Sequence, residues 1–331
     1  MGTRSAGLEA AERLSTRTRH WMGRHADYLG SPAAHAELPV TPHVKALLQL
    51  ALLCRTWRRI APADADLVAP AAVVERTWQR ADFPRLLTVD PRYARQFQLM
   101  YAALAPATSA PGTSRVTPER DGVRTGAAVE FDGSLERGKS PYLQLETRFY
   151  ADLAGVEHRL ASYQELYASS LLARAGALRV AELDVCEIAH TVFHLSDFGF
   201  RDAGLTGGDL DRAVDVVDRL TERCVRQGAW DLTGKLVLAQ YCLGVDPLST
   251  PSGASGVRML ERALSPDGAI PGKSLAERAA PDATPVAFFR RAYQSTLGTA
   301  LAMLVVTGGR SGELATTGAY TAGSYTAGGA R

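Results

Sequence analysis

Residues 183–199 read LDVCEIAHTVFHLSDFG, and this stretch indicates the fold class. When it is drawn as a helix at about 100° per residue, its apolar side chains point in several directions rather than along one face. These apolar side chains are Ile188, Val192, Phe193 and Leu195. A helix that is apolar on most of its sides is buried, so the stretch predicts an interior helix packed among other helices.

One side of the same predicted helix is polar. Cys186, Glu187, His190, His194 and Asp197 fall within about a third of the helix circumference, because residues three, four or seven apart share a face. We call these five residues the polar stripe. Unpaired polar groups in a protein interior cost free energy, so the stripe requires either a cavity or hydrogen-bonding partners.

The polar stripe has three interpretations, and the residues alone leave all three open. His190, His194 and Asp197 have a spacing that suits one divalent metal ion held by imidazole and carboxylate groups. In a second interpretation, a histidine paired with Asp197 or Glu187 is a general acid–base. In the third, the stripe is a structural polar network that keeps neighbouring helices in register.

Helical periodicity extends over most of the chain, and we find no convincing strand pattern after residue 140. The sequence therefore predicts an all-α protein of about eleven helices joined by short turns. The predicted helices lie near residues 8–29, 41–60, 63–80, 91–104, 142–154, 160–175, 181–198, 209–226, 231–243, 255–264 and 285–306.

Two segments depart from the helical pattern. Residues 106–140 contain many Gly and Pro among polar residues and predict a flexible insert, with one short β-hairpin around residues 127–131. Residues 307–331 repeat Tyr-Thr-Ala-Gly and have no apolar face, which predicts a disordered tail. The expected order is an N-terminal helical part over 1–105, the insert, a C-terminal helical part over 141–306, and the tail.

Composition and charge argue against several classes of protein. The chain has 331 residues, 37 Lys+Arg, 35 Asp+Glu and a formal net charge of +2. It therefore lacks the strong positive charge that is typical of proteins that bind nucleic acids. Its four cysteines form no CxxC pair, which argues against a structural zinc site or a disulfide framework. The apolar run over residues 44–54 is too short and too polar to span a bilayer, and no secretory signal is visible. We therefore expect a cytoplasmic protein without a membrane partner.

Motifs for common chemistries are absent from the sequence. There is no phosphate-binding glycine loop, no GxSxG nucleophile turn and no nucleic-acid recognition motif. One further carboxylate is a candidate: Asp231 lies at the start of a predicted helix, where it either caps the helix or faces a central pocket.

Three sets of residues support a resemblance to a known family. They are the pattern L-D-x-x-x-x-x-H-x-x-F-x-x-S-D-F-G over residues 183–199, the segment WDLTGKLVL over 230–238, and PDGAIP over 266–271 followed by YQSTL over 293–297. Together they resemble a bacterial, chiefly actinobacterial, family of uncharacterised helical proteins, some of which are encoded beside natural-product biosynthesis genes. The third set also looks like the repeats of α/α-toroids, the architecture of terpenoid cyclases and protein prenyltransferases.

This resemblance implies an α/α-toroid-like array of helices. It places His190, Asp197 and Asp231 at recurring polar positions of the family. Two positions depart from the family pattern, since His194 stands where a tyrosine is expected and Gln294 stands where a histidine is expected. The DxDD acid of class II terpenoid cyclases is also absent, which argues against cyclisation started by protonation.

Two functions are expected from these residues. The first is a natural-product tailoring enzyme that performs acid–base cyclisation, isomerisation or lyase chemistry on a small molecule or a peptide, without a resident cofactor and beside a biosynthetic partner enzyme. Its expected catalytic residues are His190, His194, Asp197, Asp231 and Glu187. The second is a non-catalytic binding or scaffold protein for a peptide, a carrier protein or a partner enzyme.

Overall fold

The computed structural model describes residues 2–30, 36–106 and 139–309. Within these ranges the chain is all-helical and contains no strand, which confirms the predicted all-α class. The predicted hairpin over residues 127–131 lies outside the described residues, as do nearly all of the predicted insert and tail. No described helix is both long enough and apolar enough to cross a membrane.

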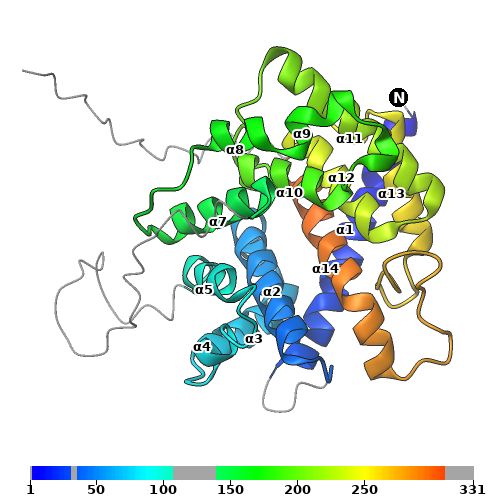
Figure 1. Cartoon of the computed structure of the whole chain (residues 1–331). Helices are drawn as coiled ribbons and strands as arrows, with labels where there is room; N and C mark the ends of the chain where they lie inside the picture. The colour runs from blue at the N-terminus through cyan, green and yellow to red at the C-terminus, as the bar shows by residue number, and fades with distance from the viewer. Residues whose placement is uncertain (1, 31–35, 107–138, 310–331) are drawn as a thin grey trace, which may run out of the picture.

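The described residues form thirteen α-helices with short 3-10 turns between some of them (Figure 1). The helices are α1 (Gly2–His25), α2 (Val40–Ile60), α3 (Val68–Trp78), α4 (Phe83–Leu86), α5 (Ala94–Ala103), α7 (Pro141–Ala154), α8 (Tyr163–Ser169), α9 (Leu171–Arg174), α10 (Val185–Ser196), α11 (Gly207–Gln227), α12 (Trp230–Cys242), α13 (Pro251–Ala263) and α14 (Pro285–Gly308).

Two of the predicted helices need correction. The helix predicted over 160–175 is divided into α8 and α9, because Ser170 has extended backbone (φ −72°, ψ 162°) and its side chain accepts a hydrogen bond from the N–H of Ala173. The helix predicted over 181–198 is shorter at both ends, since Asp184 caps α10 and Asp197 ends it in the left-handed conformation. Helix α4, a single turn, was not predicted.

Helix α14 lies at the centre of the molecule, with α2 on one side and the group of α11, α12 and α13 on the other (Figure 1). It packs against α1, α2 and α12, and its second half is buried almost without interruption from Thr299 to Val306. Helix α10 packs between α7 and α12, and α7 packs on α5. All these helices contribute to one continuous apolar core. The N-terminal and C-terminal helices therefore share that core.

The PDGAIP turn noted in the sequence joins α1 to α14. Trp21 of α1 donates its indole N–H to the carboxylate of Asp267 (3.1 Å). The backbone N–H of Ile270 donates to the hydroxyl of Thr296 on α14 (2.9 Å). At the tip of the turn Gly268 has φ 102°, a conformation that residues with a Cβ rarely adopt. These contacts give the PDGAIP and YQSTL motifs a structural role.

Close packing between α12 and α13 depends on Gly256. A Cβ atom at this position would lie 2.9 Å from the Cγ2 of Thr233 and 3.0 Å from the Cγ2 of Val237, both of them on β-branched side chains of α12. A second glycine, Gly208 of α11, is different, because a Cβ atom there would meet nothing within 4 Å.

We therefore expect Gly256→Ala to lower the free energy of unfolding by about 1–3 kcal/mol, because the added methyl group overpacks a filled interface. Gly208→Ala is the matched control and should leave stability unchanged or raise it by up to about 1 kcal/mol, since alanine favours the helix. Urea denaturation of both variants measures the two effects. Equal stability of the two variants would contradict the assigned packing.

Candidate functional site

The polar stripe begins in a well-capped part of α10. Asp184 accepts a hydrogen bond from the backbone N–H of Glu187 (3.0 Å), which fixes the first turn of the helix. His190 lies one turn after Cys186, and its ring centroid is 6.3 Å from that of Tyr142 on α7. The residue as a whole is half-buried, but its Nδ1 atom is buried and has no hydrogen-bond partner within the described part of the chain.

His190 is neutral at physiological pH. Burial, aided by the positive charges of Lys235 and Lys45 and opposed by Asp231, lowers its pKa to about 3. A neutral imidazole with an unpaired nitrogen can donate one hydrogen bond to a bound molecule or accept one from it.

Asp231 and Lys235 form an ion pair beside His190. The Nζ atom of Lys235 lies 2.7 Å from a carboxylate oxygen of Asp231 and 3.9 Å from the Sγ atom of Cys186. The side chains of Asp231 and Lys235 are only 10% and 20% exposed. Burial is the largest single effect on Lys235 and lowers its pKa, but the charges of Asp231 and Cys186 and the hydrogen bonds to both together raise the pKa overall.

Of the two roles considered for Asp231, capping of the helix is wrong. The residue at the cap position of α12 is Ala229, and Asp231 lies inside the first helical turn. From there its carboxylate reaches Lys235 one turn later on the same face. Helix α14 approaches Asp231 at Gly298, where an added Cβ atom would lie 3.9 Å from the carboxylate of Asp231. Gln294, which stands where a histidine was expected, is one turn before Gly298.

Glu146 on α7 is a candidate that sequence reasoning missed. Its residue is 8% exposed, and burial raises its pKa to about 7, although a hydrogen bond from Gln96 and the charges of Lys45 and Lys139 act to lower it. The charge of Lys45 acts on both Glu146 and His190, and that of Glu146 acts on Tyr142. A signal was available, since Glu146 interrupts an apolar stripe at helical spacing along α7.

These residues come from three helices. Lys235 contacts Asp231 and Cys186 and its charge acts on His190, and Glu146 is linked to His190 through the charge of Lys45, which acts on both. We define the inner polar cluster as Glu146, Cys186, His190, Asp231 and Lys235, which lie on α7, α10 and α12. Two of its members, His190 and Asp231, were expected as catalytic residues from the sequence.

His194 lies beside the cluster but within an aromatic environment. Its residue is 2% exposed, and its ring centroid is 5.2 Å from that of Phe149, 6.0 Å from that of Tyr150 and 5.9 Å from that of Phe198. Burial lowers the pKa of His194 well below its usual range. His194 is therefore a neutral core residue, although its ring lies 5.9 Å from that of His190.

Asp197 does not share the face that the sequence predicted for it. Because α10 ends at Ser196, Asp197 adopts φ 47° and ψ 50°, and its carboxylate pairs with a guanidinium nitrogen of Arg59 on α2 (2.9 Å). Glu187 is half-buried at the other end of the helix, where burial and the nearby Asp184 raise its pKa. Neither residue belongs to the inner polar cluster.

The expected metal ligands do not converge in this structure. His194 is enclosed by aromatic rings, and Asp197 is held by Arg59. Across the described ranges, no group of three or more His, Cys, Asp and Glu side chains has an arrangement that could hold a metal ion.

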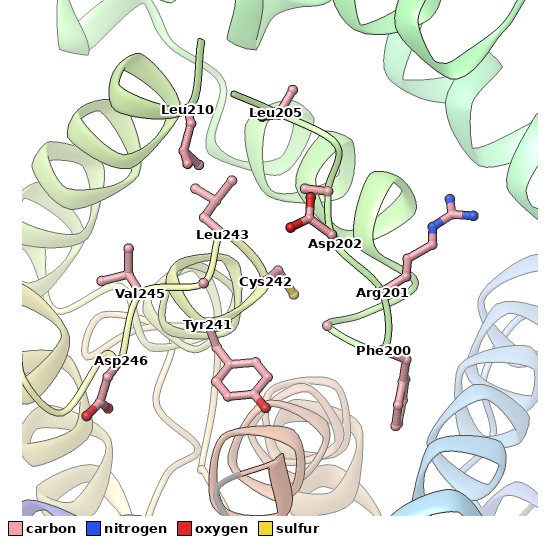
Figure 2. Close-up of a pocket in the computed structure, with 13 residues that line it drawn as sticks. Phe200, Arg201, Asp202, Leu205, Leu210, Tyr241, Cys242, Leu243, Val245 and Asp246 are labelled. Atoms are coloured by element: carbon pink, nitrogen blue, oxygen red, sulfur yellow. The ribbon is translucent and has the colours of Figure 1, made fainter. Parts of the chain in front are cut away.

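A separate cavity of about 730 Å³ lies at the C-terminal end of α10. Figure 2 shows its walls, which come from the connection between α10 and α11 and from the end of α12 with the turn that follows it. Its lining residues are Gly199, Phe200, Arg201, Asp202, Ala203, Leu205, Leu210, Tyr241, Cys242, Leu243, Gly244, Val245 and Asp246. None of the expected catalytic residues lines it.

Comparison with known families adds one finding to this geometry. A family model described as a domain of unknown function, DUF6895, matches residues 15–304. The chain belongs to the DUF6895 family. The DUF6895 domain runs from within α1 to within α14, so it contains the inner polar cluster and the helices that meet at α14. No curated protein matches the chain, and no solved structure matches it either.

The four cysteines should differ sharply in reactivity. Burial raises the pKa of Cys54 and of Cys242 to about 12 and also raises that of Cys224, whereas Cys186 is half-buried beside the ammonium group of Lys235. We expect iodoacetamide at pH 7.5 to alkylate Cys186 and to spare the other three in the folded protein. Peptide mapping after short labelling tests this, with Cys186→Ser as the control. Labelling of all four at similar rates would refute the assigned environments.

Glu146 should make stability depend on pH. Its pKa is about 7 in the folded protein and near 4.5 in the unfolded chain, so above pH 4.5 the unfolded chain loses this proton first. The free energy of unfolding therefore falls by about 3 kcal/mol as the pH rises from 4.5 to 7. Glu146→Gln removes this ionisation, so the variant should gain stability over the natural protein at pH 8 but not at pH 4. Urea denaturation at both pH values measures the difference, and parallel stabilities would contradict the burial of an ionisable carboxyl.

Proposed function

We propose that this protein is an acid–base enzyme that moves protons on a small molecule or peptide bound beside His190. The observation that supports the proposal is the inner polar cluster, in which the charges of Lys45 and Lys139 act on the buried carboxyl of Glu146 and the charge of Lys45 also acts on the neutral imidazole of His190. A carboxyl with a pKa of about 7 is present in both protonation states at neutral pH, so it can both donate and accept a proton.

Each member of the cluster has a chemical role in this proposal. Glu146 exchanges the proton. His190 uses its unpaired Nδ1 to orient the substrate by a hydrogen bond. Lys235, held in place by Asp231, and Lys45 supply positive charge that stabilises negative charge developing on the substrate. Cyclisation, isomerisation and lyase reactions that pass through an enolate or carbanion use this combination of proton transfer and anion stabilisation.

The biological setting of the proposal rests on the resemblance of residues 183–199 and 266–297 to proteins encoded near natural-product genes. Under this proposal the substrate is a natural-product intermediate, the location is cytoplasmic, and a biosynthetic partner enzyme supplies or receives the substrate. An α/α-toroid-like arrangement belongs to the same proposal, because paired helices around an axis would enclose a polar site between them.

A second candidate function is a non-catalytic binding or scaffold protein. The observation that favours it is that several polar residues expected to be catalytic already have structural partners. Asp197 pairs with Arg59, Asp231 pairs with Lys235, and His194 packs among aromatic rings. Under this proposal the cluster holds α7, α10 and α12 together, and its variants change stability alone.

Solvent deuterium distinguishes the two functions even when the substrate is unidentified. We expect the protein, incubated in D₂O with a small-molecule extract of its source cells, to introduce deuterium into at least one metabolite or to convert it to a new mass. Glu146→Gln should lower the rate by at least about 100-fold, which is the usual contribution of a general acid–base. High-resolution mass spectrometry over time measures the rate.

The matched control is Glu222→Gln, because Glu222 is an exposed glutamate of α11 that pairs with the neighbouring Arg226 across 3.7 Å. This control should retain the full rate. Retention of the full rate by a folded Glu146→Gln variant would overturn the role of Glu146. If the natural protein alters no metabolite, the binding or scaffold function is favoured instead.

A further inference from the structure

The cavity at the end of α10 has the features of a ligand site that is independent of the inner polar cluster. Its volume of about 730 Å³ falls within the range of small-molecule sites. It adjoins the C-terminal end of α10, whereas the contact between Cys186 and Lys235 lies at the N-terminal end of that helix.

The backbone that leads into one wall of the cavity is strained, and Gly199 is the residue of this stretch that lines the cavity. Asp197, Phe198 and Gly199 have φ of 47°, 56° and 89°, so three successive residues lie in the left-handed region and two of them carry a side chain. Such strain is characteristic of functional sites. The absence of a side chain at Gly199 allows the ring of Tyr241 to lie against the backbone, because a Cβ atom there would be 3.0 Å from that ring.

Arg201 holds this wall in place and is not available to a ligand. Its guanidinium group donates hydrogen bonds to the carbonyl oxygens of His194 and Leu195, both at 2.8 Å, which satisfies the end of α10. The same group lies 4.6 Å from the ring centroid of Tyr163. Figure 2 shows the side chain of Arg201 directed away from the centre of the cavity.

The lining also contains two carboxylates, and the first belongs to Asp202, an exposed residue. Asp202 uses one carboxylate oxygen to accept a hydrogen bond from the N–H of Gly204 (2.6 Å), and Figure 2 shows this carboxylate turned toward Leu243. A second carboxylate, that of Asp246, stands at the other end of the lining. Asp246 accepts a hydrogen bond from the N–H of Leu248 (3.0 Å), so Asp202 is the carboxylate that we assign to ligand binding.

Part of the remaining lining is apolar. Leu205, Leu210, Leu243 and Val245 surround the space that Asp202 faces. The nucleophilic side chain of the lining, Cys242, is buried, and burial raises the pKa of its thiol to about 12. The cavity is therefore suited to reversible binding rather than to covalent chemistry.

We propose that this cavity binds a small amphiphilic amine, whose ammonium group pairs with Asp202 and whose hydrocarbon part packs on Leu205, Leu210 and Leu243. An amine satisfies the carboxylate and covers the leucines at once. A carboxylate ligand of the same shape would be repelled, and a neutral one would lack the ion pair.

Isothermal titration calorimetry with three probes of equal chain length tests this proposal. We expect hexylamine to bind, and hexanol and hexanoate to bind at least tenfold more weakly. Asp202→Asn should weaken hexylamine binding at least tenfold. Asp211→Asn, an exposed aspartate of α11 outside the cavity, should leave it unchanged.

A second variant guards against an indirect effect of Asp202→Asn on the fold. Leu210→Arg places a bulky cation in the half-buried wall and should abolish hexylamine binding while the thermal unfolding midpoint stays within a few degrees. The proposal is overturned if no probe binds, if hexanoate binds as tightly as hexylamine, or if neither variant weakens binding. Because none of these measurements uses enzymatic turnover, their outcome is separate from that of the acid–base function.

Discussion

The packing of α14 against α1, α2 and α12 is the contact on which the rest of the structure depends. The second half of this helix is enclosed by apolar side chains, so its burial supplies a large share of the hydrophobic free energy of folding. The turn at Asp267 and Ile270 fixes the angle between α1 and α14 through two side-chain hydrogen bonds. Helices α7 and α10 then pack around this centre, and α10 brings its polar stripe inside the molecule.

An interior polar stripe has to be reconciled with the cost of removing it from water. The chain does so in two ways. Asp231 and Lys235 neutralise one another as an ion pair, whereas His190, His194 and Glu146 shift their pKa values so that the neutral form is favoured. The first solution produces a fixed local ion pair, and the second leaves two neutral histidines and one carboxyl, Glu146, that can exchange a proton near neutral pH. The inner polar cluster contains both.

Much of the fold could be predicted from the sequence, because helical periodicity depends only on neighbouring residues. The periodicity identified α10 as a buried helix, but it extended that helix through Asp197, and the left-handed turn that redirects this side chain to Arg59 depends on tertiary contacts. The candidate site was predicted in part, since His190 and Asp231 belong to the inner polar cluster. Glu146 was missed although its place in the apolar stripe of α7 indicates burial, because its raised pKa depends on the depth of that burial and on charges from other helices, which the stripe does not show.

The contact between α1 and α14 also has a consequence for how the chain acquires its structure. During synthesis the ribosome completes α1 more than 250 residues before it reaches the end of α14, since α1 ends at His25 and α14 covers Pro285–Gly308. The apolar face of α1, which includes Leu14 and Trp21, therefore lacks its main partner throughout most of translation. Such long-range contacts slow folding and leave exposed apolar surface for molecular chaperones to recognise. The contact between α1 and α14 can consequently form only after α14 has emerged from the ribosome.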